Sequence, residues 1–388
     1  MSALLASIQR ELKHLRYNRG DLFLAVGLLP LLCLLVWWIF SAGQPLNLPI
    51  AVVDQTPSSS SRELTRMINA APGVSVDQHW QTSAPAIDAL RQRHVYAVLL
   101  MPNDFESSLL RGDSAELVLL LNTQYSTYSS TIQRDVQQAI LTVGTGISAD
   151  RLQRLGMYDD ESIVTMMPIK VLVSTLYNEG PNYEVFLSAT LIPALFQILA
   201  MVLTVSAIGR ELRDGSARNW LQVAKGSVFI ALFGKLLPYL MLLALYGAIY
   251  ILLFYHLAPA SYAGSSWAAY FTFVLMVAAA MSISIFIIAI TRNFRMGLSV
   301  AGFYSAPAFA YSGQAFPLIA MPELAQLWAS ILPLTHWLKI YNQVWLAGAP
   351  WAAIIAPLTI LLAMWFSAVP AALLLRQFSF HPASWGGR

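Results

Sequence analysis

The chain has 388 residues, of which 57% are hydrophobic and only 11% are charged, and its net charge is +3. A soluble domain ordinarily has about 25% charged residues, so this composition excludes a typical soluble enzyme and indicates a polytopic membrane protein. Basic residues are scattered at the ends of apolar runs rather than gathered in one patch, which argues against a nucleic-acid partner. The single cysteine, Cys33, lies inside an apolar run and excludes a disulfide framework or a cysteine metal cluster.

Charge is divided unevenly along the chain. Residues 42–184 contain nine Lys/Arg and fifteen Asp/Glu, a net of −6, whereas the remainder contains fourteen basic and five acidic residues, a net of +9. The polar, acidic segment 42–184 is therefore predicted to be a domain outside the membrane, inserted between the first two spans.

The N-terminal residues 1–20 have an amphipathic helical pattern, which predicts a cytoplasmic helix lying on the membrane interface. A solvated basic start to a membrane anchor is the alternative. Residues 21–41 follow as the first span, because the apolar run has the roughly twenty residues needed to cross the hydrocarbon. Ser41-Ala42-Gly43 resembles a weak cleavage site, but the apolar core exceeds the 7–15 residues of a signal peptide, so retention is predicted. In the helix predicted within residues 1–20, the apolar face comprises Leu4, Leu5, Ile8, Leu12 and Leu15, and Arg10, Lys13 and Arg16 lie mostly opposite.

The inserted segment alternates strand-like and helix-like patterns, which predicts an α/β domain. It has no metal-ligand spacing, no nucleophile elbow and no phosphate-binding loop, and His79 and His94 lack partners at ligand spacing. Ordinary surface or core roles are expected for both histidines. Strands are predicted at Leu48–Val53, Val74–Val76, Val95–Met101 and Glu116–Leu121, and helices at Ser59–Asn69, Ala84–Gln92 and Tyr125–Leu155.

Residues 185–388 are predicted to be a transmembrane domain with helices 2–6. The turn-rich Asn178–Tyr183 leads into it. Four apolar runs mark predicted spans, Phe186–Ile208, Leu236–Leu257, Trp267–Ile290 and Trp351–Leu375, and Gly297–Tyr311 is predicted to begin the remaining one. The fold predicted for the whole chain is a polytopic α-helical membrane protein with six transmembrane helices and an α/β extracytoplasmic domain between helices 1 and 2.

Two segments interrupt these apolar runs. Residues 209–225 form a charged loop that begins GRELRDGSARNWL, and its charged side chains are expected to stand in water at a membrane surface. Residues 312–350 contain Pro317, Pro322, Pro333 and Pro350, a proline density that a straight span does not tolerate. This second segment is predicted to be a broken hairpin that enters the membrane from the outer face, with an ordinary amphipathic external loop as the alternative.

Six spans place both termini on one side of the membrane. If that side is the cytoplasm, thirteen of the fourteen basic residues outside the insert are cytoplasmic and only Lys339 is external. The positive-inside rule therefore predicts a multi-pass protein with cytoplasmic termini and an extracytoplasmic segment 42–184. The spans contain few ionisable groups, which argues against a proton or sodium relay.

Three stretches, in this order, resemble the permease subunits of ABC type-2 exporters, in the multidrug-type subgroup with a large extracytoplasmic domain. The insert's IAVVDQTPSSSSREL and AVLLMPNDFESSLLRGDSAELVLLLN are similar to the corresponding domain. Arg210-Glu211-Leu212-Arg213-Asp214-Gly215-Ser216 resembles the cytoplasmic signature after the second span. Ser312–Pro317, Met321-Pro322 and Leu332–Thr335 resemble the pattern before the last span, with Gly313, Pro317, Pro322 and Pro333 as the residues of the outer broken hairpin.

The resemblance implies a permease in the bacterial inner membrane that moves a hydrophobic or amphipathic substrate outward. It implies a dimer of identical or related permeases, two cytoplasmic ATPase subunits and, often in double-membrane bacteria, a periplasmic adaptor and an outer-membrane channel. The chain lacks G-x-x-x-x-G-K-[ST], so it is expected to be no enzyme and to hold no cofactor, with ATP and magnesium on the partner ATPase.

The resemblance assigns ATPase coupling to Arg210, Glu211, Arg213, Asp214 and Gly215. Substitution of Arg210 or Glu211 by Ala is then expected to uncouple transport in a folded protein. The alternative is that these charges only orient the chain in the membrane. Two other protein classes remain open: an ion-coupled secondary transporter, and a membrane-anchored receptor or scaffold that uses the outer domain.

Overall fold

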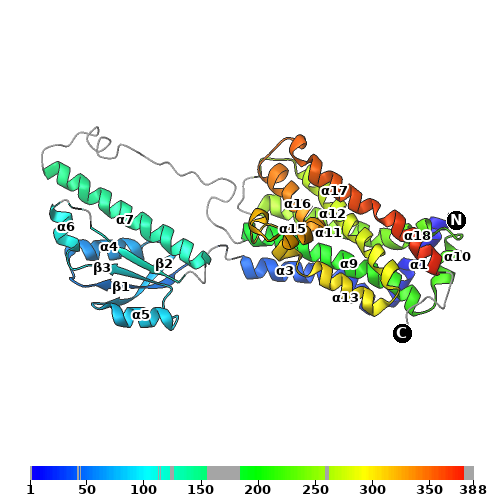
Figure 1. Ribbon diagram of the computed structural model, residues 1–388, viewed down its shortest axis with the longest axis horizontal. Coiled ribbons are helices and arrows are strands. Elements are labelled where there is room, and N and C mark those ends of the chain that lie inside the picture. Colours follow the sequence, from blue (N-terminus) through cyan, green and yellow to red (C-terminus); the bar gives the residue numbers. More distant parts are fainter. Residues whose placement is uncertain are drawn as a thin grey trace. The chain divides into compact units, whose positions relative to one another are not determined.

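The computed structural model describes residues 2–41, 43, 45–111, 113, 115–122, 126–154, 184–257 and 262–379. The chain forms two compact units, Gln44–Ser174 and the combination of Met1–Gly43 with Thr175–Arg388 (Figure 1). The predicted turn at Asn178–Tyr183 lies outside the described residues.

The first unit contains a four-stranded mixed sheet in the order β2-β1-β3-β4. The central strand β1 pairs in parallel with β2 and β3, whereas β4 pairs antiparallel with β3. These strands coincide with the four strands that the apolar runs predict, with ends shifted by a few residues. Their bounds are Leu48–Asp54 for β1, Val74–Trp80 for β2, Ala97–Met101 for β3 and Val118–Leu121 for β4.

Helices cover both faces of this sheet. Alternate residues of β1 point to opposite faces, so Ile50 and Val52 share a core with α4 and α7, while Ala51 and Val53 pack with α5. Ser58 begins α4 with a capping box, its Oγ accepting a hydrogen bond from the backbone N–H of Ser61. The helices are α4 (Ser59–Asn69), α5 (Ser83–Arg91), α6 (Phe105–Arg111) and α7 (Ser126–Arg154); α6 was not predicted.

The second unit is entirely helical in its described residues. Long helices run side by side, with α1, α10 and α18 near one end and α15 and α16 near the other (Figure 1). Its N-terminal part comprises α1 (Ala3–Tyr17), α2 (Arg19–Leu22), a π-helical turn (Phe23–Gly27) and α3 (Leu28–Phe40). A second π-helical turn (Glu184–Ser188) precedes α9 (Ala189–Arg213), α10 (Ala217–Val223), α11 (Val228–Leu257), α12 (Ser266–Thr291), α13 (Phe294–Ser305) and α14 (Ala308–Tyr311). The C-terminal part has a 3₁₀ turn (Leu318–Ala320), α15 (Glu323–Ser330), α16 (Pro333–Ile340), a π-helical turn (Tyr341–Leu346), a 3₁₀ turn (Trp351–Ile354), α17 (Ile355–Phe366) and α18 (Ala368–Ser379).

Within the described residues, five helical segments are long and apolar enough to cross a membrane: Arg19–Phe40, Phe186–Arg213, Val228–His256, Ser266–Thr291 and Trp351–Gln377. The predicted span Gly297–Tyr311 is not among them. There the structure has α13, whose twelve residues reach about 18 Å, and the separate short helix α14 after Pro307. The prediction of six spans therefore remains a prediction.

Segment 312–350 folds into short helical pieces whose starts coincide with prolines. Pro317 precedes the 3₁₀ turn, Pro322 precedes α15, and Pro333 is the first residue of α16, a position where its missing N–H is unneeded. Seven of the eight residues of α16 are buried, whereas Leu324 on α15 is 82% exposed. The two helices therefore differ in burial, whereas entry of the segment into the membrane from the outer face stays a prediction, with an amphipathic external loop as its alternative.

Candidate functional site

The N-terminal helix α1 packs closely against α11. Ser7 Oγ donates a 3.5 Å hydrogen bond to the carbonyl of Ala231, and a Cβ added at Gly234 would lie 2.6 Å from the Cβ of Ser7. The buried residues of α1 are Ser7, Glu11 and Leu15, spaced four apart along one face. Glu11 is consequently carried into the helical unit, which contrasts with a helix lying alone on a membrane surface.

Six charged side chains meet where α1 and α2 pack against α9 and α11, and we call them the charge cluster. Glu11 lies at its centre: its Oε1 accepts hydrogen bonds of 2.6 Å from Arg210 Nη2 and from Tyr239 Oη, and its Oε2 accepts a 2.6 Å bond from Lys235 Nζ. Arg210 Nη1 also donates to Asp21 Oδ2 over 2.7 Å. The cluster balances three cations with three carboxylates: Arg10, Arg210 and Lys235 with Glu11, Asp21 and Glu211.

Glu211 is the second carboxylate that joins several helices. Arg10 donates to both of its oxygens, over 2.6 Å and 2.8 Å, in the paired geometry that suits a guanidinium and a carboxylate. Lys235 Nζ donates to Glu211 Oε1 over 2.7 Å, and Ser216 Oγ donates to Oε2 over 2.5 Å. Glu211 therefore links α1, α11 and the residue before α10.

Four members of the cluster are buried, so the expectation that the charges of 209–225 stand in water is wrong for Arg210 and Glu211. Lys235 is 1% exposed, Glu11 2%, Glu211 3% and Arg210 7%. Arg210, Glu211 and Lys235 lie just beyond the predicted spans Phe186–Ile208 and Leu236–Leu257, so the prediction of few ionisable groups inside the spans stays a prediction. Burial raises the pKa of Glu11, but Lys235, Arg210 and the hydrogen bonds outweigh it, so the pKa lies below its usual range.

The predicted loop 209–225 is largely helical. Helix α9 continues to Arg213, and Gly215 then adopts a left-handed conformation with φ of +68°. Ser216 N donates to the carbonyl of Glu211 over 2.9 Å, the bond that closes a Schellman-type helix end. The turn therefore favours glycine at position 215, because a residue with a side chain would be strained at this positive φ.

The short helix α10 is fixed directly after this turn. Trp220 is 1% exposed, and its indole N–H donates to the carbonyl of Ala231 on α11 over 3.2 Å. Lys235 Nζ lies 5.6 Å from the centre of the Trp220 ring, within cation–π distance. Helix α10 is consequently attached to α11 and, through Ser216, to the charge cluster.

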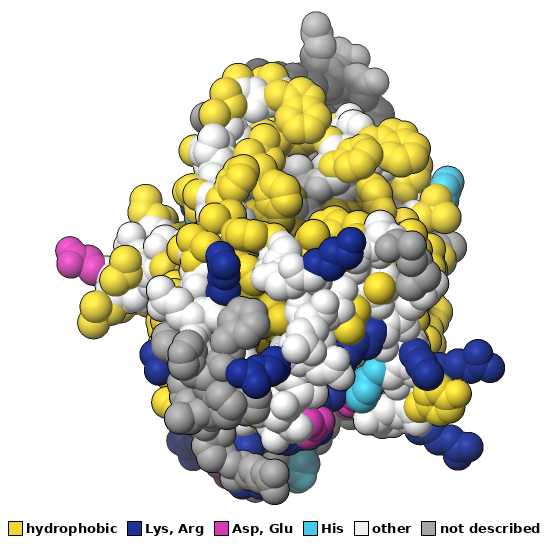
Figure 2. All heavy atoms as spheres, turned by 90° about the vertical axis from the view of Figure 1, so that its right-hand side faces the viewer, with side chains coloured by type: hydrophobic (Ala, Val, Ile, Leu, Met, Phe, Trp, Pro, Cys, Tyr) yellow, Lys and Arg dark blue, Asp and Glu magenta, His cyan; other side chains and the backbone are white. Residues whose placement is uncertain are grey.

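The remaining predicted coupling residues lie at the surface. Arg213 and Asp214 form an ion pair of 2.8 Å, with side chains 46% and 47% exposed, and Gly215 and Arg218 are also exposed. Figure 2 views the end of the helical unit that carries α1 and α10, and Lys and Arg side chains gather over it. The structure thus divides the five predicted residues: Arg210 and Glu211 are internal, whereas Arg213, Asp214 and Gly215 are accessible.

The four predicted hairpin residues lie elsewhere. Gly313 has φ of +88° and packs against Leu318, and the prolines begin the short helical pieces described above. The hairpin helices α15 and α16 occupy the opposite end of the helical unit from α1 and α10 (Figure 1). The structure therefore does not bring the two predicted residue sets together.

Sequence reasoning identified only two of the six cluster members, Arg210 and Glu211. Arg10 and Lys235 were assigned to the cytoplasm, and neither Asp21 nor Glu11 was selected. The signal for Glu11 was present, because it is the one acidic residue of α1 and lies four residues from both Ser7 and Leu15. Among the described residues, no group of three or more His, Cys, Asp or Glu side chains could hold a metal ion.

Comparison with known proteins gives the family. The ABC-2 family transporter protein model matches residues 20–374. The chain is 24% identical over 352 residues to the "Probable multidrug ABC transporter permease YbhR" of Escherichia coli K12, covering 88% of this chain and 89% of that protein, and to the protein of the same name from strain O157:H7. It is also 22% identical over 368 residues to "ABC transporter G family member 20" of Dictyostelium discoideum, covering 92% of this chain and 49% of that protein.

No solved structure was found to match the chain. The family match spans both the helical unit and the inserted sheet domain, and it agrees with the resemblance of the three sequence stretches. The chain belongs to the ABC-2 family of transporter proteins and is a multi-pass membrane permease.

Proposed function

We propose that this chain is the permease subunit of an ATP-driven exporter in the bacterial inner membrane, which moves hydrophobic or amphipathic molecules outward. In this proposal both termini are cytoplasmic and residues 42–184 lie outside, as the distribution of basic residues favours. A separate ATPase subunit supplies the energy, and a second permease chain completes the dimer. An adaptor and an outer-membrane channel would be further partners in a double-membrane bacterium.

The observation that carries the proposal is the attachment of α10. This seven-residue helix is joined to α9 by one tight turn, to α11 by Trp220, and to α1 through Glu211 and Arg10. A displacement of α10 by a cytoplasmic partner would therefore be passed to three helices as one body. Exposed Arg218 on α10, and exposed Arg213 and Asp214 just before it, offer that partner charged groups.

Two observations support the proposed substrate class. The similar Escherichia coli proteins are named as probable multidrug permeases, and the spans here are apolar and rich in aromatic side chains. An apolar path suits molecules that partition into the membrane.

Ion-coupled secondary transport is the second candidate, and the buried carboxylates of the charge cluster are the observation that favours it. Each of the six members, however, already makes at least one ion pair, and the cluster is balanced in charge. Binding a proton or sodium ion would require one of those pairs to break. A receptor or scaffold role for the inserted domain is the third candidate.

Purification of the chain from its native host in mild detergent tests the exporter proposal. Mass spectrometry should identify a co-purifying subunit with a G-x-x-x-x-G-K-[ST] motif, and a transported hydrophobic compound should stimulate its ATP hydrolysis. Transport in liposomes that depends on an imposed proton or sodium gradient, without ATP, would support ion coupling instead. A stable protein with neither an ATPase partner nor transport would support the receptor or scaffold.

A further inference from the structure

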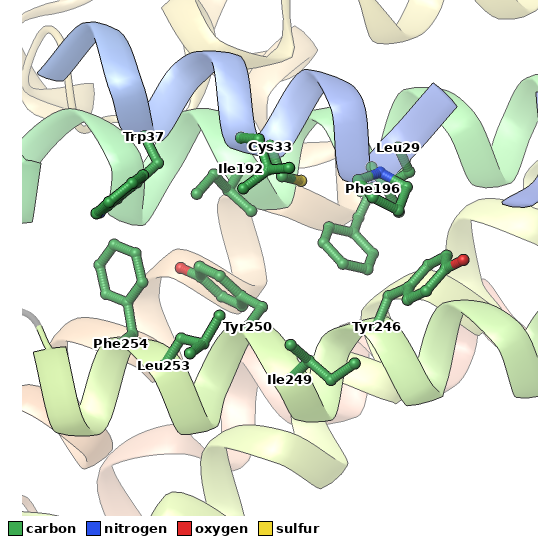
Figure 3. Close-up of a pocket in the computed structure, with 12 residues that line it drawn as sticks. Leu29, Cys33, Trp37, Ile192, Phe196, Tyr246, Ile249, Tyr250, Leu253 and Phe254 are labelled. Atoms are coloured by element: carbon green, nitrogen blue, oxygen red, sulfur yellow. The ribbon is translucent and has the colours of Figure 1, made fainter. Parts of the chain in front are cut away.

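An apolar cavity of about 360 Å³ lies inside the helical unit, between α3, α9 and α11. This volume is within the range of about 300–1,000 Å³ typical of small-molecule sites. Figure 3 shows side chains of α3 facing side chains of α11 across it, with α9 contributing to the wall. Five aromatic rings and one thiol make up half of the twelve lining residues, and the rest are aliphatic side chains and one proline; the former are Cys33, Trp37, Phe196, Tyr246, Tyr250 and Phe254.

The turn that precedes α3 is hydrogen-bonded to α11, and several side chains of α3 beyond it are exposed. The π-helical turn at Phe23–Gly27 departs from regular α-helical bonding, and the Val26 carbonyl accepts a 2.9 Å hydrogen bond from Tyr246 Oη. Leu29 is buried one turn later, but Leu34 is 62% exposed and Trp37 44% exposed. The space beside α11 is thus open toward the side of the helical unit.

The floor of the cavity is a preformed aromatic cluster. Phe196 and Tyr250 are 1% and 6% exposed, and Tyr250 lies 4.9 Å from Phe254 and 5.8 Å from Phe273 between ring centres. Phe196 makes an edge-to-face contact with Phe273 at 4.9 Å. Such a floor offers ring faces and edges to an aromatic guest.

The polar groups of the lining favour an uncharged ligand. Tyr246 Oη donates a hydrogen bond to the carbonyl of Val26, and Tyr250 Oη lies 3.5 Å from the carbonyl of Ala189. None of the lining residues is Asp, Glu, Lys, Arg or His. A charged guest would lose its hydration here without gaining a partner, whereas the polarizable Cys33 sulfur suits an aromatic ring.

A second apolar groove, on α11, α12, α17 and α18, provides a comparison within the same molecule. Its aromatic side chains are all exposed, from 45% for Trp365 to 64% for Phe271, and its buried lining residues, such as Leu232 and Leu236, are not aromatic. That groove therefore lacks the buried aromatic floor of the cavity beside α3.

We propose that the cavity between α3, α9 and α11 is a lateral binding site for uncharged aromatic molecules. The proposal deepens the exporter function and rests on it in one respect: the bound molecule is a transported substrate only if the chain is an exporter. Binding itself requires no ATPase subunit, so the two proposals can fail separately.

Photolabelling with benzophenone, an uncharged aromatic probe, tests the site in the full-length protein reconstituted in lipid nanodiscs. After irradiation, the attachment sites are mapped by mass spectrometry. We expect labelling concentrated on residues 29–37 and 246–254, at least fivefold above that on other exposed apolar helix surfaces. Naphthalene in excess should compete for this labelling.

Two tryptophan variants provide a matched pair. Ile249 lines the cavity and Val369 lines the second groove, and each is 45% exposed. Ile249→Trp should fill the cavity and reduce the labelling of both segments at least fivefold, whereas Val369→Trp should leave it unchanged. Thermal unfolding of both variants checks that each remains folded.

Labelling spread evenly over the exposed apolar surface would overturn the proposal. It would also be overturned if a phospholipid with a photoreactive acyl chain labelled the same two segments and neither benzophenone nor naphthalene displaced it, because the cavity would then hold a lipid chain. Should Ile249→Trp prove unstable, labelling of the wild-type chain that naphthalene fails to reduce would overturn it equally.

Discussion

At the scale of single residues, Lys235 is held between two carboxylates in a site that excludes water. Its Nζ lies 2.6 Å from Glu11 Oε2 and 2.7 Å from Glu211 Oε1, and the side chain is 1% exposed. Removing the cation would leave both carboxylates buried with fewer neighbouring positive charges. Such a change destabilises a protein more than replacing the whole buried ion pair by apolar side chains.

Lys235→Met should therefore lower the free energy of unfolding by about 3–5 kcal/mol, because methionine fills the space without the charge. Chemical unfolding in detergent micelles measures this. Lys225→Met is the control, since Lys225 is exposed after α10, and it should change stability by less than about 0.5 kcal/mol. Equal stability of the two variants would show that the charge cluster does not hold the helices together.

The lowered pKa of Glu11 makes a second, pH-dependent prediction. In the unfolded chain this carboxyl titrates near 4.5, whereas in the folded protein it holds its charge to lower pH. Its stabilisation is therefore fully present above about pH 5 and is lost as the pH falls below 4.5 toward the folded pKa.

Glu11→Gln should remove this contribution. The wild-type protein should be more stable than the variant at pH 7, and the difference should shrink as the pH is lowered from 5 to 3. Melting temperatures of both proteins across this range measure the effect. A difference that stays constant with pH would show that the Glu11 charge is not what stabilises the contact.

The sequence identifies some of these residues but not their burial. Arg210 and Glu211 are recognisable from the family motif, yet Arg10 and Glu211 are 201 positions apart, and only tertiary packing brings them together. Composition gives no information on such a contact, because a charged residue beside an apolar run ordinarily marks a membrane surface. Burial also changes what Arg210→Ala and Glu211→Ala can test, since loss of transport in either would include lost stability.

At the scale of elements, α1 and α11 approach most closely at a glycine. An added Cβ at Gly234 would meet the Ser7 side chain at 2.6 Å, whereas Gly302 on α13 has nothing within 4 Å of such an atom. Alanine normally stabilises a helix relative to glycine by about 0.5–1 kcal/mol, so the pair separates helix propensity from packing.

Gly302→Ala should accordingly raise the unfolding free energy by up to about 1 kcal/mol. Gly234→Ala should lower it and, if α1 is displaced, make Arg10 and Glu11 accessible. Thermal unfolding and backbone hydrogen exchange of α1 provide the two measurements. Stabilisation of both variants would contradict the close packing of α1 on α11.

Elements with strong local patterns were predictable. The strands of the inserted domain follow from short apolar runs, and α4 has the predicted bounds Ser59–Asn69. The short α6 and the end of α13 near Pro307 were not predictable from the sequence. In both cases a few residues decide whether a helix forms or continues, and their burial depends on parts of the chain that are distant in sequence.

At the scale of the whole molecule, the proposed topology places the inserted domain and α10 on opposite sides of the membrane. In a Cys33→Ser background, cysteine replaces one exposed residue in each place, Gln92 or Asn219. A membrane-impermeant maleimide should modify the Gln92→Cys protein in intact cells, and the Asn219→Cys protein only after the inner membrane is opened. Modification of both in intact cells would contradict the topology.

The central claim is that an ATPase drives this permease through the segment around α10. The most direct measurement is export together with substrate-stimulated ATP hydrolysis in proteoliposomes that contain the assembled transporter. Arg218→Glu reverses an exposed charge on α10, and Arg295→Glu reverses an exposed charge in the first turn of α13. Arg218→Glu should lower both activities at least tenfold without changing the stability of the permease. Arg295→Glu should leave both activities near normal. Normal coupled export by the Arg218→Glu transporter would contradict it.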